Sequence, residues 1–476
     1  MKGLFRKAIE NFSYFYFLAG FLVLLSAYYA LFGRIDHDEV EGVHTAWKIS
    51  VGETIYGDFF QHHHPLSYYA LIPFVKMGGE TLLAFHLSEL FVYLVFLATV
   101  FVTFLLAGRI YRDKTTSLIS VILLLSFPYF ILKGTEIRPD AIQVFFNVVS
   151  FYFFAVFMTG GTRKHLILSA VCLFLSFFAL QKTVFLVAIF GVGQLYFVYD
   201  GKMPLKQFIL YWLIFCGLCL VYAGHLFING DLGNYIDFNW LVNMRLIKEF
   251  SPFSSLFPLS SPHGILPALS MLIFVFLLIR GCFLRAGALH NLTAVAAAGL
   301  LLSIFLVKTP FPQYLLAASP FAAMVAASSL RRISGDLTIK ICLAFLVILS
   351  APFLISGAQL GKEKAGRLAL LEFVRVNSSP QDTYIGYPAN LFRKDADFFW
   401  FCTHRGYCLD AYNTFRDYDY DALAIIKENP PKIILVAPGG NKSLISALSD
   451  EFVIKNYKHY QVLVLSGNEE LRVRKW

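Results

Sequence analysis

The chain has 476 residues, of which 57% are hydrophobic, 17% are aromatic and 15% are charged. Soluble globular proteins carry roughly 45–50% apolar and about 25% charged residues, so this composition excludes a soluble protein of several domains. Fifty Phe and 25 Tyr also exclude a disordered, disulfide-stapled or collagen-like chain. The net charge of +9 comes from basic residues that stand between apolar stretches, which indicates a membrane protein and no nucleic-acid partner.

Apolar stretches near or above the length of about 18 residues that can cross a bilayer recur through the first three quarters of the chain. We predict a mainly α-helical, polytopic membrane bundle with about eleven spans. Residues 1–33 are interpreted as a retained first span, because the apolar stretch is too long for a secretory signal and no small-residue cleavage site follows. The predicted spans are 12–33, 81–108, 115–132, 141–159, 166–180, 183–199, 208–228, 265–279, 292–307, 314–330 and 339–357.

The basic residues between these spans predict the orientation. With a cytoplasmic N-terminus, the pairs and triplets of Lys and Arg fall on the cytoplasmic side, as at Arg109, Arg112 and Lys114 or at Arg331 and Arg332. The long loop 34–80 and the tail 361–476 then lie outside. We therefore predict a membrane module over residues 1–360 and an extracytoplasmic C-terminal domain over residues 361–476.

The tail differs from the rest of the chain because charged residues return. "KIILVAPGG" and "YQVLVLSG" have strand patterns, and "KAGRLALLEFVRVN" and "SLISALSDEF" have helix patterns. These patterns predict a small α/β domain.

Two of the seven cysteines lie in this tail, in "FCTHRGYCLD". An oxidising compartment permits a disulfide between Cys402 and Cys408. A metal site with His404 is the weaker interpretation, because four ligands at zinc spacing cannot be assembled here. The other cysteines lie in or beside apolar spans, where small core residues are the simpler reading.

The first external loop begins with a dense acidic group. Repulsion between carboxylates raises some pKa values unless a cation, a proton or a cationic partner compensates, whereas a solvated acidic loop would have no such role. "AWKISVGETIYGDF" and "PLSYYALIPF" indicate amphipathic segments along the membrane surface. The acidic residues are Asp36, Asp38, Glu39 and Glu41.

Further polar residues interrupt the apolar pattern on the same side. A charge in the apolar layer costs on the order of 3 kcal/mol, so such residues usually face a cavity or a partner. For Lys182 the alternative is a tight hairpin whose ammonium reaches the headgroups. Carboxylates beside cations suit a reaction that deprotonates an acceptor and stabilises an anionic leaving group. The set comprises Lys133, Glu136, Arg138, Asp140, Gln181, Lys182, Arg245, Lys248, His263, Lys308 and Tyr314.

The order of these motifs resembles the GT-C superfamily of polyprenyl-phosphate-sugar glycosyltransferases. Within it the chain is similar to the protein O-mannosyltransferases and to the bacterial transferase that adds aminoarabinose to lipid A. The resemblance covers essentially the whole chain. It is carried by Asp38-Glu39, "AWKISVGETIYGDF", "HHHPLSYY", "RPDAIQVFF", "ALQKTVFL" and "FPQYLLAASPFAAMVAA".

The resemblance implies Asp38 as the general base on the acceptor, Glu39 as its neighbour and Asp140 as a second carboxylate. His63-His64-Pro65 departs from the Lys-Pro-Pro or His-Pro-Pro of many relatives, and His63 replaces a cation only when protonated. The candidates for binding the donor phosphate and substrate are Arg138, Lys182, His63, His64, His263, Lys308 and Tyr314.

The implied activity is inverting transfer of a sugar from a polyprenyl-phosphate-linked donor, at the outer face of a bacterial inner membrane, to a protein, lipid A or an envelope glycan. No cofactor is required, since Lys and Arg can stabilise a phosphate leaving group. The "DHD" of Asp36 to Asp38 also resembles a metal-binding DxD, so a divalent metal there is an alternative. Besides the donor and acceptor, the expected partner is membrane lipid.

Two other functions stay open at the level of sequence. A transporter or flippase for lipid-linked sugars would also have many spans and buried charges, but it gives no reason for carboxylates on one side or for a structured external tail. A scaffold subunit of an envelope complex would make Asp38 dispensable.

The positive-inside pattern generates a topology prediction. A phosphatase reporter fused after Gly361 should be active outside the cell membrane, while a cytoplasmic reporter at the same position should be silent. The reverse result would move every candidate residue named above to the other side of the membrane.

Overall fold

The computed structural model describes residues 2–245, 265–284, 286–307, 311–333, 339–348, 361–386, 391–395, 398–399, 411–416, 424, 428, 430–436, 452–457 and 460–465. The chain divides into two compact units. Unit 1 comprises Met1–Arg34, Val92–His225 and Lys248–Gly361. Unit 2 comprises Ile35–Phe91, Leu226–Ile247 and Lys362–Trp476.

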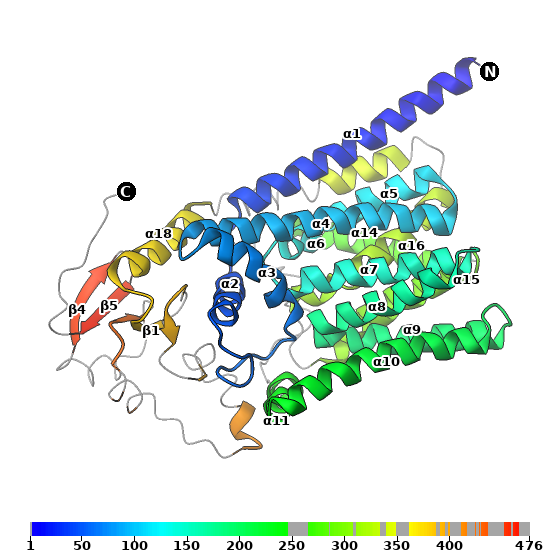
Figure 1. The fold of residues 1–476 in the computed structure, drawn as a ribbon. Helices are drawn as coiled ribbons and strands as arrows, with labels where there is room; N and C mark the ends of the chain where they lie inside the picture. Colours follow the sequence, from blue (N-terminus) through cyan, green and yellow to red (C-terminus); the bar gives the residue numbers. More distant parts are fainter. Residues whose placement is uncertain are drawn as a thin grey trace. The chain divides into compact units, whose positions relative to one another are not determined.

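Unit 1 is a bundle of helices (Figure 1). Its labelled helices are α1 (Lys2–Phe32), α4 (Leu82–Tyr111, begun in unit 2), α5 (Lys114–Leu125), α6 (Pro128–Gly134), α7 (Pro139–Met158), α8 (Arg163–Ala179), α9 (Val184–Tyr199), α10 (Leu205–Ile228), α14 (Ile265–Cys282), α15 (Ala288–Leu302) and α16 (Ser319–Ile333). The short 3-10 turns are η1 (Gln181–Thr183), η3 (Ser303–Leu306) and η4 (Pro312–Leu315).

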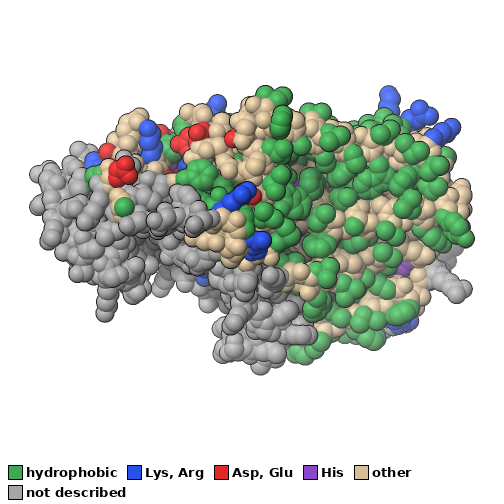
Figure 2. All heavy atoms as spheres, turned by 90° about the horizontal axis from the view of Figure 1, so that it is seen from below, with side chains coloured by type: hydrophobic (Ala, Val, Ile, Leu, Met, Phe, Trp, Pro, Cys, Tyr) green, Lys and Arg blue, Asp and Glu red, His purple; other side chains and the backbone are tan. Residues whose placement is uncertain are grey.

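Six of the described helical segments are long and apolar enough to cross a membrane: Tyr14–Phe32, Leu82–Tyr111, Pro139–Met158, Gln181–Tyr199, Leu205–Ile228 and Ala288–Leu306. Shorter apolar helices are Lys114–Leu125, Met271–Cys282 and Ile339–Ile348. The mainly helical membrane fold is therefore present, whereas the number of about eleven spans stays a prediction. Figure 2 shows hydrophobic side chains covering one face of the bundle, as lipid contact requires.

One predicted span is broken in the structure. Residues 115–132 form α5 and α6, which are separated at Phe127, whose backbone is extended (φ −81°, ψ 105°). Pro128 lacks an amide donor and disfavours helical backbone at the residue before it. The chain therefore turns here, and α6 leads into the polar segment before α7.

Small residues allow the bundle helices to pack closely. Ala322, Ala323, Ala326 and Ala327 of α16 are fully buried or nearly so. A Cβ on Gly281 of α14 would lie 2.5 Å from the backbone oxygen of Val325. Close approach through Gly and Ala is typical of membrane helices, where apolar burial alone does not drive association.

Unit 2 combines helices from the first loop with the tail. Its helices are α2 (His37–Ser50), α3 (Leu66–Gly78), α11 (Leu232–Ile236), α12 (Asn243–Arg245), α18 (Gly361–Asn377) and the π-helix η2 (Asp237–Val242). The α2 residues from Glu39 to Lys48 are all buried. This part of the first loop is therefore an interior helix of unit 2 rather than an amphipathic surface segment.

The tail contains a mixed five-stranded sheet in the order β2-β1-β3-β5-β4. Its strands are β1 (Thr383–Gly386), β2 (Lys394–Asp395), β3 (Ile433–Val436), β4 (Phe452–Tyr457) and β5 (Tyr460–Leu465). β1 pairs in parallel with β2 and β3, and β5 runs antiparallel between β3 and β4. α18, β3 and β5 lie within predicted patterns, whereas "SLISALSDEF" falls almost wholly outside the described residues. The tail as a separate domain stays a prediction.

A buried charge group joins α2 to β2 within unit 2. The Lys48 ammonium donates to Asp395 Oδ2 at 2.6 Å, and His44 Nε2 lies 3.1 Å from the same oxygen. Burial alone would raise the pKa of Asp395, but the charges of His44 and Lys48 and their hydrogen bonds lower it below its usual range. The carboxylate therefore stays ionised at neutral pH, and its contribution to stability is lost only as the pH falls below about 4.

We expect Asp395→Asn to destabilise unit 2 by about 3 kcal/mol, because it removes the closer and more buried of two carboxylates that pair with the Lys48 ammonium and leaves the partly exposed Glu53 at 3.2 Å. Asp382→Asn is the matched control. Its partner Lys432 lies 3.1 Å away and both side chains are partly exposed, so the cost should stay within about 1 kcal/mol. Thermal unfolding of the purified full-length protein would measure both, and equal effects would contradict the assigned role of Asp395.

Candidate active site

The first candidate region is the N-terminus of α2. Asp36 is the N-cap: its carboxylate accepts from the His37 amide, and the Asp36 amide donates to Glu39 Oε1 at 2.8 Å. The Glu39 amide also donates to the Asp36 carboxylate, and this bond and the Asp36 amide bond to Glu39 form a capping box, which satisfies exposed amides of the first turn. Glu39 is buried in this structural role, and Asp38 stands between the two capping residues with its side chain 27% exposed.

His37 lies between the two aspartates. Its Nδ1 is 2.6 Å from Asp36 Oδ1 and its Nε2 is 2.7 Å from Asp38 Oδ1. Burial alone would lower the pKa of His37, but the hydrogen bonds to both aspartates and their charges raise it to about 9. At neutral pH the imidazolium therefore compensates the carboxylates, which supplies the cation that the acidic loop needs.

Ligand atoms of Asp36, His37 and Asp38 lie within 4.8 Å of one another, as metal ligands would. Both ring nitrogens of His37 face carboxylates as proton donors, however, and a metal ligand must offer a lone pair. A divalent ion would require His37 to lose its proton and change its hydrogen bonds. The proposed catalytic steps therefore involve no metal at Asp36, His37 and Asp38.

The segment His63-His64-Pro65 is held by one contact to its backbone and one to a side chain. Tyr56 donates to the carbonyl oxygen of His63 at 2.8 Å. The buried His64 places Nε2 3.0 Å from the Tyr235 hydroxyl, on a helix that precedes the π-helix η2. A phenol partner gives the His64 ring a neutral hydrogen bond, which does not require the protonated state expected of a phosphate ligand.

The second candidate region is a small, partly open pocket in unit 1. It lies where the ends of α7, α15 and η3 meet η1 and η4. Its lining mixes polar and apolar side chains. The lining residues are Asp140, Gln143, Lys182, Phe185, Leu300, Ser303, Val307, Gln313, Tyr314 and Ala317.

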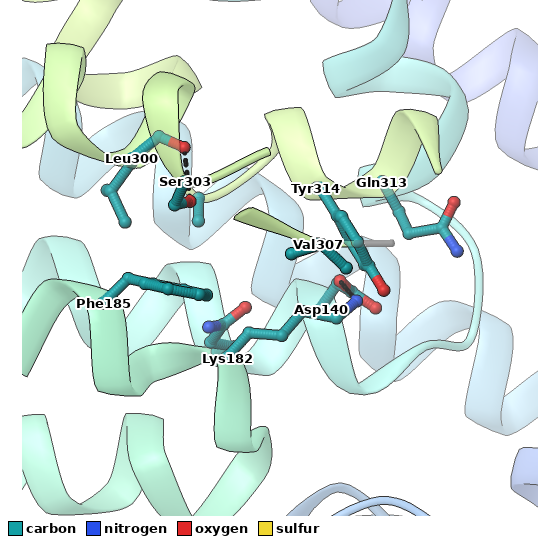
Figure 3. A pocket seen from close by; sticks show the side chains of 10 residues that line it. Asp140, Lys182, Phe185, Leu300, Ser303, Val307, Gln313 and Tyr314 are labelled. Carbon is teal, nitrogen blue, oxygen red and sulfur yellow. Dashed lines mark hydrogen bonds and ion pairs between the residues drawn. The ribbon is translucent and has the colours of Figure 1, made fainter. Parts of the chain in front are cut away.

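Lys182 is the cation of this pocket. Its Nζ lies 3.4 Å from Asp140 Oδ1 and 3.5 Å from the centre of the Tyr314 ring. Figure 3 shows the Lys182 side chain extending toward Asp140 with the Tyr314 ring beside it. The ion pair is long for a charge-assisted bond, and the ring adds a cation–π contact. The ammonium is thus held in place, and 23% of the Lys182 side-chain surface is exposed.

Hydrogen bonds between α7 and the α8–η1 turn position Lys182. Gln143 donates to Thr183 Oγ1 at 3.0 Å, and the Thr183 hydroxyl donates to the Ser176 carbonyl at 3.0 Å. Thr183 and Ser176 are fully buried. The chain therefore turns tightly at Gln181 and Lys182, as the alternative interpretation required, but the Lys182 ammonium lies beside the buried Asp140 carboxylate.

Arg138 and Lys133 share one carboxylate just before α7. Arg138 Nε donates to Glu136, and Lys133 Nζ lies 2.8 Å from Glu136 Oε1. Arg138 and Glu136 are each 6% exposed. Arg138, predicted as a phosphate ligand, is thus already paired within the protein.

Five predicted residues lie outside the described residues: Lys248, His263, Lys308, Cys402 and Cys408. Among the others, the structure brings together Asp140, Lys182 and Tyr314 from three separate elements. Sequence reasoning missed Gln143 as a lining residue. Its spacing of three from Asp140 on one helix was the available signal.

A family model for dolichyl-phosphate-mannose-protein mannosyltransferase matches residues 68–244, which include Asp140 and Lys182 but not Asp38. No curated protein matches the chain by sequence. The structure is similar to ArnT from Cupriavidus metallidurans bound to undecaprenyl phosphate, with a TM-score of 0.67 and 13% identity over 96% of this chain and 99% of that chain. The chain has a GT-C fold.

Two further structures agree with this GT-C fold. The apo state of the same ArnT gives a TM-score of 0.64 at 13% identity, over 94% of this chain and 97% of that chain. The mycobacterial arabinofuranosyltransferase AftD gives 0.52 at 12% identity, over 96% of this chain and 40% of that chain. The resemblance to GT-C glycosyltransferases that the sequence indicated is confirmed.

If the polyprenyl-phosphate donor expected from the sequence places its phosphate in this pocket, Lys182→Met should weaken the binding of a polyprenyl phosphate by about tenfold or more, because hydrogen bonds to charged groups contribute roughly 1.5–3 kcal/mol. Lys202→Met is the matched control, since Lys202 is a half-exposed lysine of unit 1 that pairs with Asp200. Titration of the purified proteins in detergent would give both affinities. An unchanged affinity in Lys182→Met would remove this pocket as the phosphate site.

Proposed function

We propose that this chain is an integral-membrane glycosyltransferase that moves a sugar from a polyprenyl-phosphate-linked donor to an extracytoplasmic acceptor. The observation that carries the proposal is the Lys182 ammonium held between Asp140 and Tyr314 in a pocket of a GT-C-type bundle. The acceptor is a protein, lipid A or an envelope glycan.

The pocket suits a lipid donor because some of its lining residues stand next to exposed apolar residues in the sequence. Ser303 and Val307 line the pocket. In the same stretch, Leu302, Phe305 and Leu306 are 57–74% exposed. Such residues on a membrane bundle contact lipid. A polyprenyl chain can therefore lie along the bundle while its phosphate enters beside the cation.

The chemistry requires a cation for the leaving group and a base for the acceptor. As the bond between the sugar and the phosphate breaks, negative charge grows on the phosphate oxygen, and a preorganised ammonium stabilises it. Asp38 accepts the proton of the acceptor hydroxyl as that oxygen attacks the anomeric carbon. A single displacement of this kind inverts the configuration at that carbon.

Asp38 fits the role of base because its side chain is partly exposed and is held in position by a contact with His37. The His37 imidazolium contacts Asp38 through Oδ1. A carboxylate has a second oxygen and further lone pairs on each, so this contact leaves capacity for an acceptor proton. Glu39 supports the position of Asp38 through the capping box.

We expect Asp38→Asn to lower turnover by about 100-fold or more while donor affinity changes little, because the amide keeps the size but takes no proton. Asp58→Asn is the matched control, since Asp58 bonds Thr54 within an exposed part of the same loop. Both are compared with wild type for formation of glycosylated product.

Near-normal turnover in Asp38→Asn would remove Asp38 from the mechanism and make Asp140 the next base to test. A transporter would give another pattern: lipid-linked sugar would cross the membrane, and no variant or wild-type sample would form glycosylated product.

A further inference from the structure

Glu136 holds two cations at the turn between α6 and α7. Its two carboxylate oxygens lie 2.8 and 3.0 Å from Lys133 Nζ, and Arg138 donates to one of them. Glu136 and Arg138 are buried, and the Lys133 side chain is 19% exposed. A buried carboxylate that bridges two cations is strongly held, because its removal would leave both charges poorly compensated.

This turn belongs to the same end of the unit 1 bundle as the pocket. Arg138 is the N-cap of α7, and Asp140 in the first turn of that helix lines the pocket. On the other side of the turn, a Cβ on Gly134 would lie 3.3 Å from the Leu316 side chain, which follows η4 and its Tyr314. The charges at this turn therefore act on an anion in the pocket over a short distance.

Among the described residues, the charges of these two groups are nearly balanced. Lys133, Arg138 and Lys182 are cations, and Glu136 and Asp140 are carboxylates. Three cations and two carboxylates leave one positive charge. Without Glu136, the same group would carry two positive charges.

The balance matters because the phosphate changes its charge during the reaction. A lipid phosphate bonded to a sugar is a diester with one negative charge. The lipid phosphate that leaves is a monoester, with about −1.5 to −2 at pH 7. Any added positive charge therefore stabilises the product more than the donor, and a site that is too positive retains its product.

Resting on the proposed function, we propose that Glu136 is a positioning residue that sets the charge of the phosphate site. It keeps Arg138 and Lys133 in place and limits their pull on the lipid-phosphate product, so that the product leaves. It forms no bond to the substrate and takes no proton.

The test compares Glu136→Gln with wild type for inhibition by undecaprenyl phosphate, donor KM and kcat. Glu136→Gln should bind undecaprenyl phosphate roughly tenfold more tightly, because one added positive charge near an anion has an effect of this order at an effective dielectric constant of about 20. Donor KM should fall by less, and kcat should fall because product release slows. A residue needed only for folding would raise KM or lower the yield instead.

A charge-restoring double variant separates charge from structure. Glu136→Gln combined with Lys133→Gln returns the group to one positive charge, so product affinity and kcat should return toward wild type. If product affinity is unchanged or weaker in Glu136→Gln, or if the double variant does not restore it, the proposal is wrong.

Lys133→Gln alone serves if Glu136→Gln does not fold. It lowers the local charge, so it should weaken the binding of undecaprenyl phosphate, and an unchanged affinity would overturn the proposal. These binding measurements are independent of turnover. Wild-type protein that binds undecaprenyl phosphate but transfers no sugar would contradict the proposed function and leave the binding effect of Glu136 to be judged on its own.

Discussion

A charge removed from water must be compensated within a few ångströms, and this constraint determines where each unit places its polar side chains. Unit 2 meets it by pairing Asp395 with Lys48 and His44, and Asp237 with Arg416. Unit 1 meets it with two groups, Glu136 with Lys133 and Arg138, and Asp140 with Lys182.

These pairs are not equivalent, and the difference is the reason for proposing the pair of Asp140 and Lys182 as the anion-binding one. The bonds of Lys48 to Asp395 and of Lys133 to Glu136 are short, at 2.6 and 2.8 Å. Lys182 lies at 3.4 Å from Asp140, shares its charge with an aromatic ring and faces a pocket. A cation with such a long bond and an accessible side can exchange part of its interaction for an incoming anion at low cost. In the proposed mechanism, Lys182 binds the donor phosphate by this exchange.

Much of the helical fold could be predicted from the length of the apolar stretches. The features that were not predicted include one local break in a helix and one contact between residues distant in the sequence. The apolar lengths predicted α4, α7 and α10 closely, because a hydrophobic run of that length has few alternatives. The break before Pro128 could have been anticipated from the proline itself. The contact between α2 and β2 could not, since Lys48 and Asp395 are 347 residues apart and no sequence pattern links them.

The candidate site divides in the same way. The polar interruptions at Asp140, Lys182 and Tyr314 indicated a common cavity, and the structure brings these three side chains together. The structural role of Glu39 was readable as well, because Asp36 followed three residues later by Glu39 is a capping-box signature. The imidazolium bridge of His37 and the bridging role of Glu136 depend on side-chain geometry. A sequence pattern alone does not specify that geometry.

We propose above that the chain transfers sugar from a polyprenyl-phosphate donor. The most direct measurement incubates the purified full-length protein with a panel of radiolabelled polyprenyl-phosphate sugars and envelope acceptors, and follows label on the acceptor together with release of polyprenyl phosphate. If the protein is such a transferase, at least one donor should give labelled acceptor and an equal amount of released lipid phosphate. Binding or translocation of the donors with no transfer to any acceptor would contradict it.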